Sequence, residues 1–388
     1  MKRNYGIDLL RITAMGFVAG LHVIGIGGII TGSELLSGQF LTAQLLKTAM
    51  LCAVNCYALI SGFVGWDRRP RLSALGLLWL KALLFCVGIT AFFALNRPLG
   101  WKVLLNAALP VSTGQYWYLT AYVGLFVLMK LLNGAIAAMP KRELTWTLAG
   151  IFLLFSLLPI SPLTDAFWLH DGYSVLWLAV LYLLGGYLGK YRLLEGLSAG
   201  VWMGIFVGSV LIAWAPRMLA LWLMPGLWSL SGGNILIEYT SPTIVAAAVA
   251  LLAVFARLRL PQRSAQLVKQ LTPHAFGVYL FHAHPLMFQY AMEGRFAQLG
   301  TAPIPVLIGA VLGAALVICA AGLAADWLVT GLLRLLRLDR LLKKLDPPAS
   351  IPQLFASVRK SQNPVSPCAS IKPQRKTNTT SKSRRNKL

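Results

Sequence analysis

Residues 6–30 read GIDLLRITAMGFVAGLHVIGIGGII, an apolar stretch that nevertheless contains Asp8, Arg11 and His22. A helix of roughly 20 mainly apolar residues crosses a bilayer, and an ionisable side chain inside such a helix is costly and usually functional. The stretch has no small-residue cleavage site after a short apolar core, so we do not interpret it as a cleavable signal peptide. It predicts a first membrane span with a functional face.

The spacing of these charged residues places them on one side of the helix. Asp8 and Arg11 are three positions apart and can pair across one turn. Arg11 and His22 are separated by ~1100° of rotation and roughly 16 Å of rise, so both lie on one stripe. The helix thus presents a cation near one end and an imidazole deep in the membrane. The alternative is a snorkelling Arg11 and a His22 that is hydrogen-bonded inside the bundle.

The rest of the chain has the same apolar character. Of its 388 residues, 57% are hydrophobic and 12% are charged, and the mean hydropathy is +0.69. Soluble domains carry roughly a quarter charged residues, so this balance excludes a soluble globular enzyme, a disordered chain and a disulfide-stapled domain. We predict an all-α polytopic membrane protein with about ten transmembrane helices. The predicted spans are 6–30, 41–66, 72–95, 115–133, 144–160, 173–189, 199–222, 238–256, 274–292 and 303–333.

The basic residues predict the orientation of these spans. The formal net charge is +23, from 35 Lys and Arg against 12 Asp and Glu. If the N-terminus is cytoplasmic, the far side of the membrane holds only Arg97, Lys102, Arg217 and Arg295. This asymmetry follows the positive-inside rule, so we expect both termini to be cytoplasmic and explain the charge by topology, not by nucleic-acid binding.

The chain is expected to consist of a membrane domain followed by a disordered tail. Residues 1–345 are predicted to form the membrane domain, ending in an amphipathic basic helix at 334–344 on the inner leaflet. Residues 346–388 carry nine Lys and Arg and six prolines, which predicts a disordered cytoplasmic tail attracted to anionic membrane lipids. RNA binding by the tail is the rival interpretation, but no aromatic residue beyond Phe355 is interleaved with its charges.

Several polar and aromatic residues in other spans are further candidates for the site. Asn55 and Ser61, in the second span, either join two helices or line a substrate channel. Gln115, Trp117 and Tyr118 open the fourth span; they either anchor it at the membrane interface or contact a sugar by stacking and hydrogen bonding.

The histidines and cysteines do not predict a metal site. His282 and His284 are two positions apart on the ninth span, so they point to different faces of a helix. The five cysteines show no paired spacing beyond Cys52 and Cys56, and we expect the four that lie in predicted spans to be buried as small apolar residues.

Five of these segments, taken in order, resemble the membrane acyltransferase-3 family. Arg11 and His22 form an Arg-x10-His pattern that follows Asp8-Leu-Leu. The other four segments are NCYALISGFVGW (55–66), GQYWYLTAYVGLFVLMKLLN (114–133), GYSVLWLAVLYLLGGYLGKY (172–191) and LTPHAFGVYLFHAHPLM (271–287). They are most similar to the polysaccharide-modifying branch. The resemblance extends to about residue 345 and does not include the basic tail.

The resemblance implies an integral enzyme of the bacterial plasma (inner) membrane. Such an enzyme moves an acyl group, usually acetyl, from cytoplasmic acyl-CoA to a hydroxyl of a cell-surface or lipid-linked glycan, without a metal. Arg11, beside Asp8, suits a CoA phosphate because its guanidinium is planar and permanently charged. His22 then serves either as general base or as nucleophile, and both roles stay open. His282 matches a position of the family and is expected at the site.

Two other functions compete with this one. A transporter or flippase for a lipid-linked sugar would use a similar aromatic lining, but it should show broken helices and several charges near the midplane. A scaffold or receptor that acts through its basic tail would be indifferent to His22.

Overall fold

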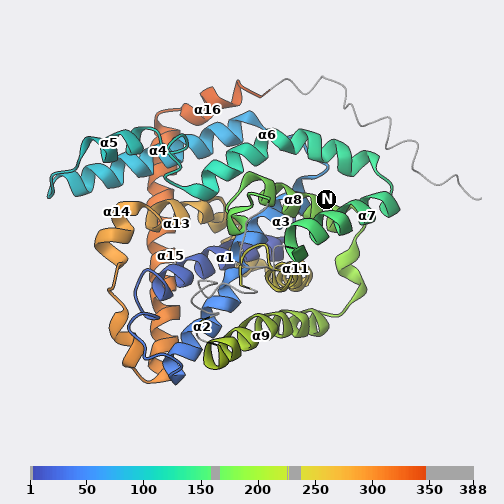
Figure 1. The fold of residues 1–388 in the computed structure, drawn as a ribbon. Coiled ribbons are helices and arrows are strands. Elements are labelled where there is room, and N and C mark those ends of the chain that lie inside the picture. The colour runs from blue at the N-terminus through green and yellow to red at the C-terminus, as the bar shows by residue number, and fades with distance from the viewer. Residues whose placement is uncertain (1–2, 159–166, 225, 227–236, 347–388) are drawn as a thin grey trace, which may run out of the picture. The chain divides into compact units, whose positions relative to one another are not determined.

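The computed structural model describes residues 3–158, 167–224, 226 and 237–346, and these contain helices and no strand. The predicted all-α fold class is therefore confirmed for the described residues (Figure 1). The α-helices are α1 (Tyr5–Ile24), α2 (Gly38–Leu51), α3 (Ala53–Gly65), α4 (Leu72–Ala94), α5 (Trp101–Ala108), α6 (Trp117–Ala138), α7 (Lys141–Phe152), α8 (Val175–Lys190), α9 (Ala199–Leu223), α11 (Pro242–Arg257), α12 (Gln262–Leu271), α13 (Ala275–His282), α14 (Pro285–Met287), α15 (Ile304–Leu335) and α16 (Leu338–Lys343). Short 3₁₀ or π turns are η1 (Leu153–Leu157), η3 (His170–Gly172), η4 (Leu193–Gly196), η5 (Thr272–His274), η6 (Phe288–Met292) and η7 (Ala297–Thr301).

Six helical stretches among the described residues are long and apolar enough to cross a membrane. They are α1, α2 with α3, α4, α6, α9 and α15. Helices α8 and α11 are apolar but shorter. The predicted span 144–160 is less regular, because α7 passes into the π-helical turn η1. The chain is thus a multi-pass membrane protein by composition and helix length.

Helix α1 is shorter than the predicted first span because residues at both ends fix its limits. The Asn4 side chain accepts hydrogen bonds from the backbone N–H groups of Gly6 (2.9 Å) and Ile7 (3.2 Å), which caps the helix start. The helix ends at Ile24, not near residue 30, where the glycine-rich sequence begins and Gly28 adopts a positive φ of 84°.

The predicted ninth span, 274–292, is wrong as a single helix. Helix α13 ends at His282, and the chain restarts as α14 at Pro285. Proline has no backbone N–H and cannot continue the ladder of the preceding helix. The His284 ring instead accepts a hydrogen bond from the Leu286 N–H (3.1 Å) and caps the new start.

The predicted amphipathic helix at 334–344 is also wrong in its limits. Helix α15 runs on to Leu335, Arg337 adopts a left-handed conformation (φ 56°), and α16 is a separate short helix. Leu342 of α16 lies against Gly76 of α4. The C-terminal segment therefore packs on the protein, and its leucines do not all face lipid.

Asp346 fastens this segment to the start of α4. Its carboxylate accepts hydrogen bonds from the Ser73 N–H (2.9 Å) and from the Ser73 hydroxyl (2.5 Å). These bonds favour the charged form and lower the pKa of Asp346. The rest of the predicted tail, 347–388, lies outside the described residues.

Helix α1 occupies the inside of the bundle. It packs against α2, α3, α11, α13 and α15 (Figure 1). The most apolar 18-residue stretch of α1 is 56% buried, whereas the corresponding stretches of α6, α9 and α15 are each 28% buried. The exposed side chains of those outer helices include Val127, Leu131, Leu316 and Val317, as expected for surfaces in contact with lipid. The charged and polar residues of α1 are thus held within protein.

Close helix packing is set by glycines. A Cβ atom at Gly62 of α3 would collide with the Tyr182 carbonyl oxygen of α8, and one at Gly185 of α8 would collide with the Leu59 carbonyl oxygen of α3. Small residues that let two backbones approach are typical of helix interfaces in membranes. This contact fixes α3, which carries one wall of the candidate site.

Candidate active site

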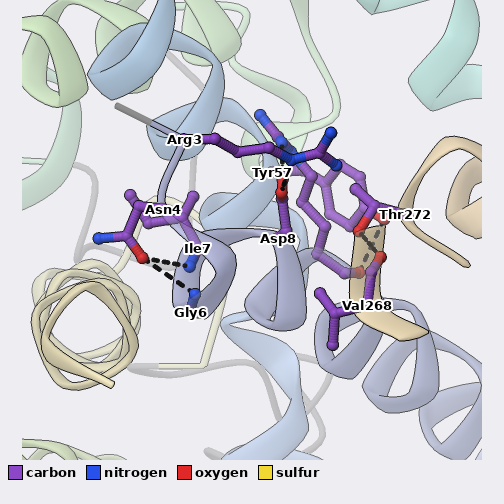
Figure 2. A network of polar contacts seen from close by, with 9 residues as sticks. Arg3, Asn4, Gly6, Ile7, Asp8, Tyr57, Val268 and Thr272 are labelled. Atoms are coloured by element: carbon purple, nitrogen blue, oxygen red, sulfur yellow. Dashed lines mark hydrogen bonds and ion pairs between the residues drawn. The ribbon is translucent and has the colours of Figure 1, made fainter. Parts of the chain in front are cut away.

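Asp8 gathers two arginines at the N-terminal end of α1. Its carboxylate accepts from Arg3 Nε (2.6 Å) and from Arg11 Nη1 (2.8 Å), and the Asp8 side chain is only 8% exposed. Figure 2 shows Arg3 reaching across to Asp8, with Tyr57 beside them. The predicted pairing of Asp8 and Arg11 is confirmed. Arg3 was not predicted because it precedes the helix and the periodicity that places residues on faces does not apply to it.

The two guanidinium groups leave this end of the helix positively charged. One carboxylate balances only one of the two cations. The Arg11 side chain is 27% exposed and uses one nitrogen on Asp8, so it has N–H donors left for a further oxygen ligand. This arrangement can bind a phosphate group while Asp8 holds Arg11 in place.

At the other end of the stripe, His22 meets His282. The His22 Nδ1 lies 3.0 Å from the His282 Nε2, and the ring centroids are 5.1 Å apart. Phe288 packs edge-on against His22 with ring centroids 4.8 Å apart. The break after α13 ends the helix at His282, opposite α1. Both histidines were candidate site residues from the sequence, but their contact was not predicted.

The hydrogen bonds determine which nitrogen of each ring carries the proton. The His282 Nδ1 lies 2.5 Å from the Val278 carbonyl oxygen, which can only accept, so this Nδ1 is the protonated nitrogen. In the neutral ring the His282 Nε2 is then an acceptor, and His22 Nδ1–H donates to it. The remaining nitrogen of His22, Nε2, has a free lone pair. His282 thus orients His22 as a base.

His22 lines a cavity whose void is about 410 Å³, the space at its open mouth included. Its other lining residues are Met15, Val18, Leu21, Val54, Tyr57, Trp117, Tyr118, Tyr239 and Tyr279. Met15 and Val18 lie on the α1 stripe between Arg11 and His22, so the cavity follows that stripe. An apolar pocket with a few polar groups is typical of a substrate site.

Tyr57 links the cavity to the arginine end. Its ring lines the cavity, and its hydroxyl donates to the Arg11 carbonyl oxygen (2.8 Å). Tyr57, Tyr239 and Tyr279 were not predicted, because aromatic residues in apolar spans carry no signal that separates a cavity wall from a packed core.

Trp117 and Tyr118 join this wall and are not simple interfacial anchors. Tyr118 is 6% exposed, and the Trp117 ring stacks on Tyr239 with centroids 6.0 Å apart. The predicted association of both residues with a substrate site remains a prediction, but their position in the cavity is compatible with it.

Gln115 lies beside a different histidine. Its amide nitrogen is 2.9 Å from the His284 Nε2. Because the His284 Nδ1 accepts from Leu286 N–H, the neutral ring must donate through Nε2, and the Gln115 amide therefore turns its oxygen to that donor. Gln115 does not line the cavity of His22.

Asn55 connects different parts of the fold, Ser61 is bonded within its own helix, and neither residue lines the cavity. The Asn55 amide donates to the Tyr239 carbonyl oxygen (2.7 Å) and accepts from Trp177 Nε1 (3.3 Å), and the residue is fully buried. The Ser61 hydroxyl donates to the Tyr57 carbonyl oxygen one turn earlier (2.9 Å). Between the two interpretations left open, helix–helix contact fits Asn55.

A second buried charged cluster surrounds Asp326, whose partners Lys81 and His274 were not predicted. Asp326 of α15 is fully buried and accepts at Oδ2 from Lys81 Nζ (2.6 Å), His274 Nδ1 (2.7 Å) and Thr330 Oγ1 (3.2 Å). The intramembrane charges are therefore not confined to the first span. The cluster joins α4, η5 and α15, and none of its members lines the cavity of His22.

Neither the histidines nor the cysteines gather into a metal site within the part of the chain that the structure describes, where no group of three or more His, Cys, Asp or Glu is placed to hold an ion. Cys52, Cys56, Cys86 and Cys319 are buried and free, as expected.

Comparison with known proteins identifies the family. The family model described as an acyltransferase domain, that of the acyltransferase-3 family, matches residues 4–325. This range holds every residue of the cavity and both ends of the α1 stripe. No curated protein and no solved structure matches the chain. Because the match covers most of the chain, the protein belongs to the acyltransferase-3 family and is an acyltransferase.

Proposed function

We propose that this acyltransferase-3 member moves an acyl group, with acetyl expected, from cytoplasmic acyl-CoA to a hydroxyl of a cell-surface or lipid-linked glycan. The observation that carries the proposal is the α1 stripe. It joins a phosphate-binding arginine at one end to an oriented base at the other, along a cavity with apolar walls.

The residues at the N-terminal end of α1 suit the acyl donor. CoA carries several phosphates and a long flexible arm that ends in the thioester. Arg11, with Asp8 and Arg3 around it, would hold a phosphate through charge-assisted hydrogen bonds. The arm would follow Met15 and Val18 towards His22. Positive charge near the cytoplasmic mouth also attracts an anionic donor.

The chemistry assigned to His22 is proton transfer. His22 Nε2 accepts the proton of the glycan hydroxyl as the oxygen attacks the thioester carbonyl carbon. The carbon–sulfur bond then breaks, the ester forms, and the thiolate takes the proton from His22 to give free CoA. Attack by His22 itself, through an acyl-imidazole, is the second route. His282 supports either route because its Nε2 accepts the His22 Nδ1–H bond in both.

The aromatic side of the cavity suits the acceptor. Trp117, Tyr173 and Tyr239 lie together, with the Trp117 and Tyr173 ring centroids 4.4 Å apart and those of Tyr173 and Tyr239 5.0 Å apart. Ring faces of this kind stack on sugars, and tyrosine hydroxyls add hydrogen bonds.

The same proposal includes ten spans in the plasma (inner) membrane of a bacterium, with both termini cytoplasmic. A reporter that fluoresces only in the cytoplasm is expected to be bright when fused after Lys344 and dark when fused after Gly172, because of the distribution of Lys and Arg. Measuring fluorescence per molecule of fusion protein checks this. Bright fluorescence after Gly172 with darkness after Lys344 would reverse the orientation and the side from which acyl-CoA enters.

A flippase for a lipid-linked sugar is the second candidate, and the break between α13 and α14 is a feature that it shares. The break is accounted for by Pro285 and by the His284 cap. The charges of Lys81 and Asp326 are paired with each other, and they lie away from the cavity. A flippase would also need no acyl-CoA, so dependence on that donor separates the two functions.

Replacing His282 by alanine is expected to lower the rate of acyl transfer roughly 10- to 100-fold, because His22 then loses the acceptor that fixes its tautomer. His282→Gln offers an amide oxygen as acceptor and should recover part of the rate. Initial rates in membranes that contain equal amounts of each variant measure the effect. A wild-type rate for His282→Ala would remove His282 from the site.

The proposed function is tested by the O-acyl groups of surface polysaccharides in a strain that lacks the protein. NMR and mass spectrometry should show that one type of O-acyl group is lost and that it returns when the wild-type chain is supplied. An unchanged set of O-acyl groups would contradict the proposed glycan acceptor.

A further inference from the structure

Tyr118 has a buried hydroxyl that forms no hydrogen bond with any residue in the described ranges 3–158, 167–224, 226 and 237–346. Neighbouring tyrosines use theirs. Tyr57 donates to the Arg11 carbonyl oxygen (2.8 Å), and Tyr116 donates to the Leu280 carbonyl oxygen (2.6 Å). A buried polar group without a partner is uncommon in folded proteins, and it calls for a functional explanation.

The surroundings of Tyr118 hold its ring firmly in the cavity wall. Tyr57 and Tyr279 both pack edge-on against it, with centroids 6.3 and 6.4 Å away, and Tyr122 stacks on it with centroids 6.4 Å apart. All of these rings except Tyr122 line the same cavity as His22. The ring of Tyr118 therefore belongs to a rigid aromatic wall beside the α1 stripe.

Two ring contacts give the position of Tyr118 along the stripe. Tyr57 is bonded to the backbone of Arg11, and Tyr279 lies one turn before His282, the partner of His22, so Tyr118 lies between the two ends of the stripe. On the proposed function, the stretch between the phosphate-binding end and the base is crossed by the arm of the acyl donor. That arm is apolar apart from its amide groups and one secondary hydroxyl.

We infer that the Tyr118 hydroxyl binds an amide group of the pantetheine arm of the acyl donor, which makes Tyr118 a positioning residue for the thioester. A phenol can donate to an amide oxygen or accept from an amide N–H, so it matches either half of such a group. The apolar walls around it make that hydrogen bond stronger than it would be in water. This inference rests on the proposed function.

Binding of acetyl-CoA to the purified full-length protein in lipid nanodiscs tests the inference. Tyr118→Phe removes only the hydroxyl, and we expect the Kd for acetyl-CoA to rise about three- to tenfold, the range for one lost neutral hydrogen bond. Adenosine 3′,5′-bisphosphate resembles the nucleotide end of CoA without the arm, and its Kd should stay within about twofold of the wild-type value. Arg11→Ala should weaken the binding of both.

Tyr116→Phe is the matched control, because Tyr116 lies two positions away, is also buried and does not line the cavity. Its loss of a satisfied hydrogen bond should lower the unfolding temperature and leave both Kd values unchanged. Tyr118→Phe should unfold at the wild-type temperature or above, since it removes a hydroxyl without a partner.

Three results would overturn the role of Tyr118. They are an unchanged Kd for acetyl-CoA in Tyr118→Phe, an equal loss of affinity for the bisphosphate nucleotide, and a fall in unfolding temperature like that of Tyr116→Phe. Failure of the wild-type protein to bind acetyl-CoA at all would instead contradict the proposed function, so the two failures are distinguishable.

Discussion

Replacing His22 by alanine is expected to reduce glycan acylation to the level of a strain without the protein. The variant loses the only side chain that the proposal uses as a base, and general-base catalysis alone contributes about 10²–10⁴-fold. The loss of an oriented group, set between His282 and the cavity, adds to this. The O-acyl content of the surface polysaccharide, measured at equal protein levels in the membrane, gives the result.

The matched control is His170→Ala. His170 is exposed in the turn η3 and takes no part in the cavity, so this variant should acylate glycan like the wild type. If His22→Ala keeps wild-type acylation, the catalytic assignment of His22 is wrong. A loss in both variants would mean that the effect is not specific to the site.

Replacing Asp326 by asparagine is expected to lower the free energy of unfolding by about 3–5 kcal/mol. The substitution conserves size, but it leaves the Lys81 ammonium group buried without a carboxylate. It also weakens the bond that fixes His274 at the start of α13. Thermal unfolding of the variant and the wild type in mild detergent measures this loss, and the midpoint temperature of the variant should be much lower.

The double variant Lys81→Met with Asp326→Asn is the control for this prediction. It removes both charges together, and exchanging a buried ion pair for neutral groups of similar size is often nearly neutral. We expect it to recover most of the stability lost by Asp326→Asn alone. A single variant as stable as the wild type would show that the pair does not hold α4 and α15 together.

The sequence predicted the parts of the site that follow from helical periodicity. Asp8, Arg11 and His22 share one helix, so their relative positions depend only on rotation and rise per residue. For the same reason the membrane class and the approximate positions of the long spans were predictable from composition and apolar runs. The all-α fold follows because helices satisfy their own backbone hydrogen bonds in lipid.

What depends on packing between helices could not be predicted. The contact of His22 with His282 joins residues 260 positions apart, and it requires α13 to end where it does. Lys81, His274 and Asp326 come from three separate segments, so the sequence favoured a structural pairing for Asp326 without identifying its partners. Pro285 was the one sign of a break in this region of the sequence, but the apolar residues on both sides of it favoured one continuous span.

The role proposed for the histidine pair at the end of the α1 stripe is the transfer of an acyl group from acyl-CoA to a glycan. Its most direct test uses inverted membrane vesicles from the native host, which carry the host's own glycans, together with acetyl-CoA labelled in the acetyl group. Vesicles with the wild-type protein should transfer label to glycan, and vesicles with His22→Ala should transfer no more than vesicles lacking the protein. Equal labelling of glycan by wild type and His22→Ala would contradict the account.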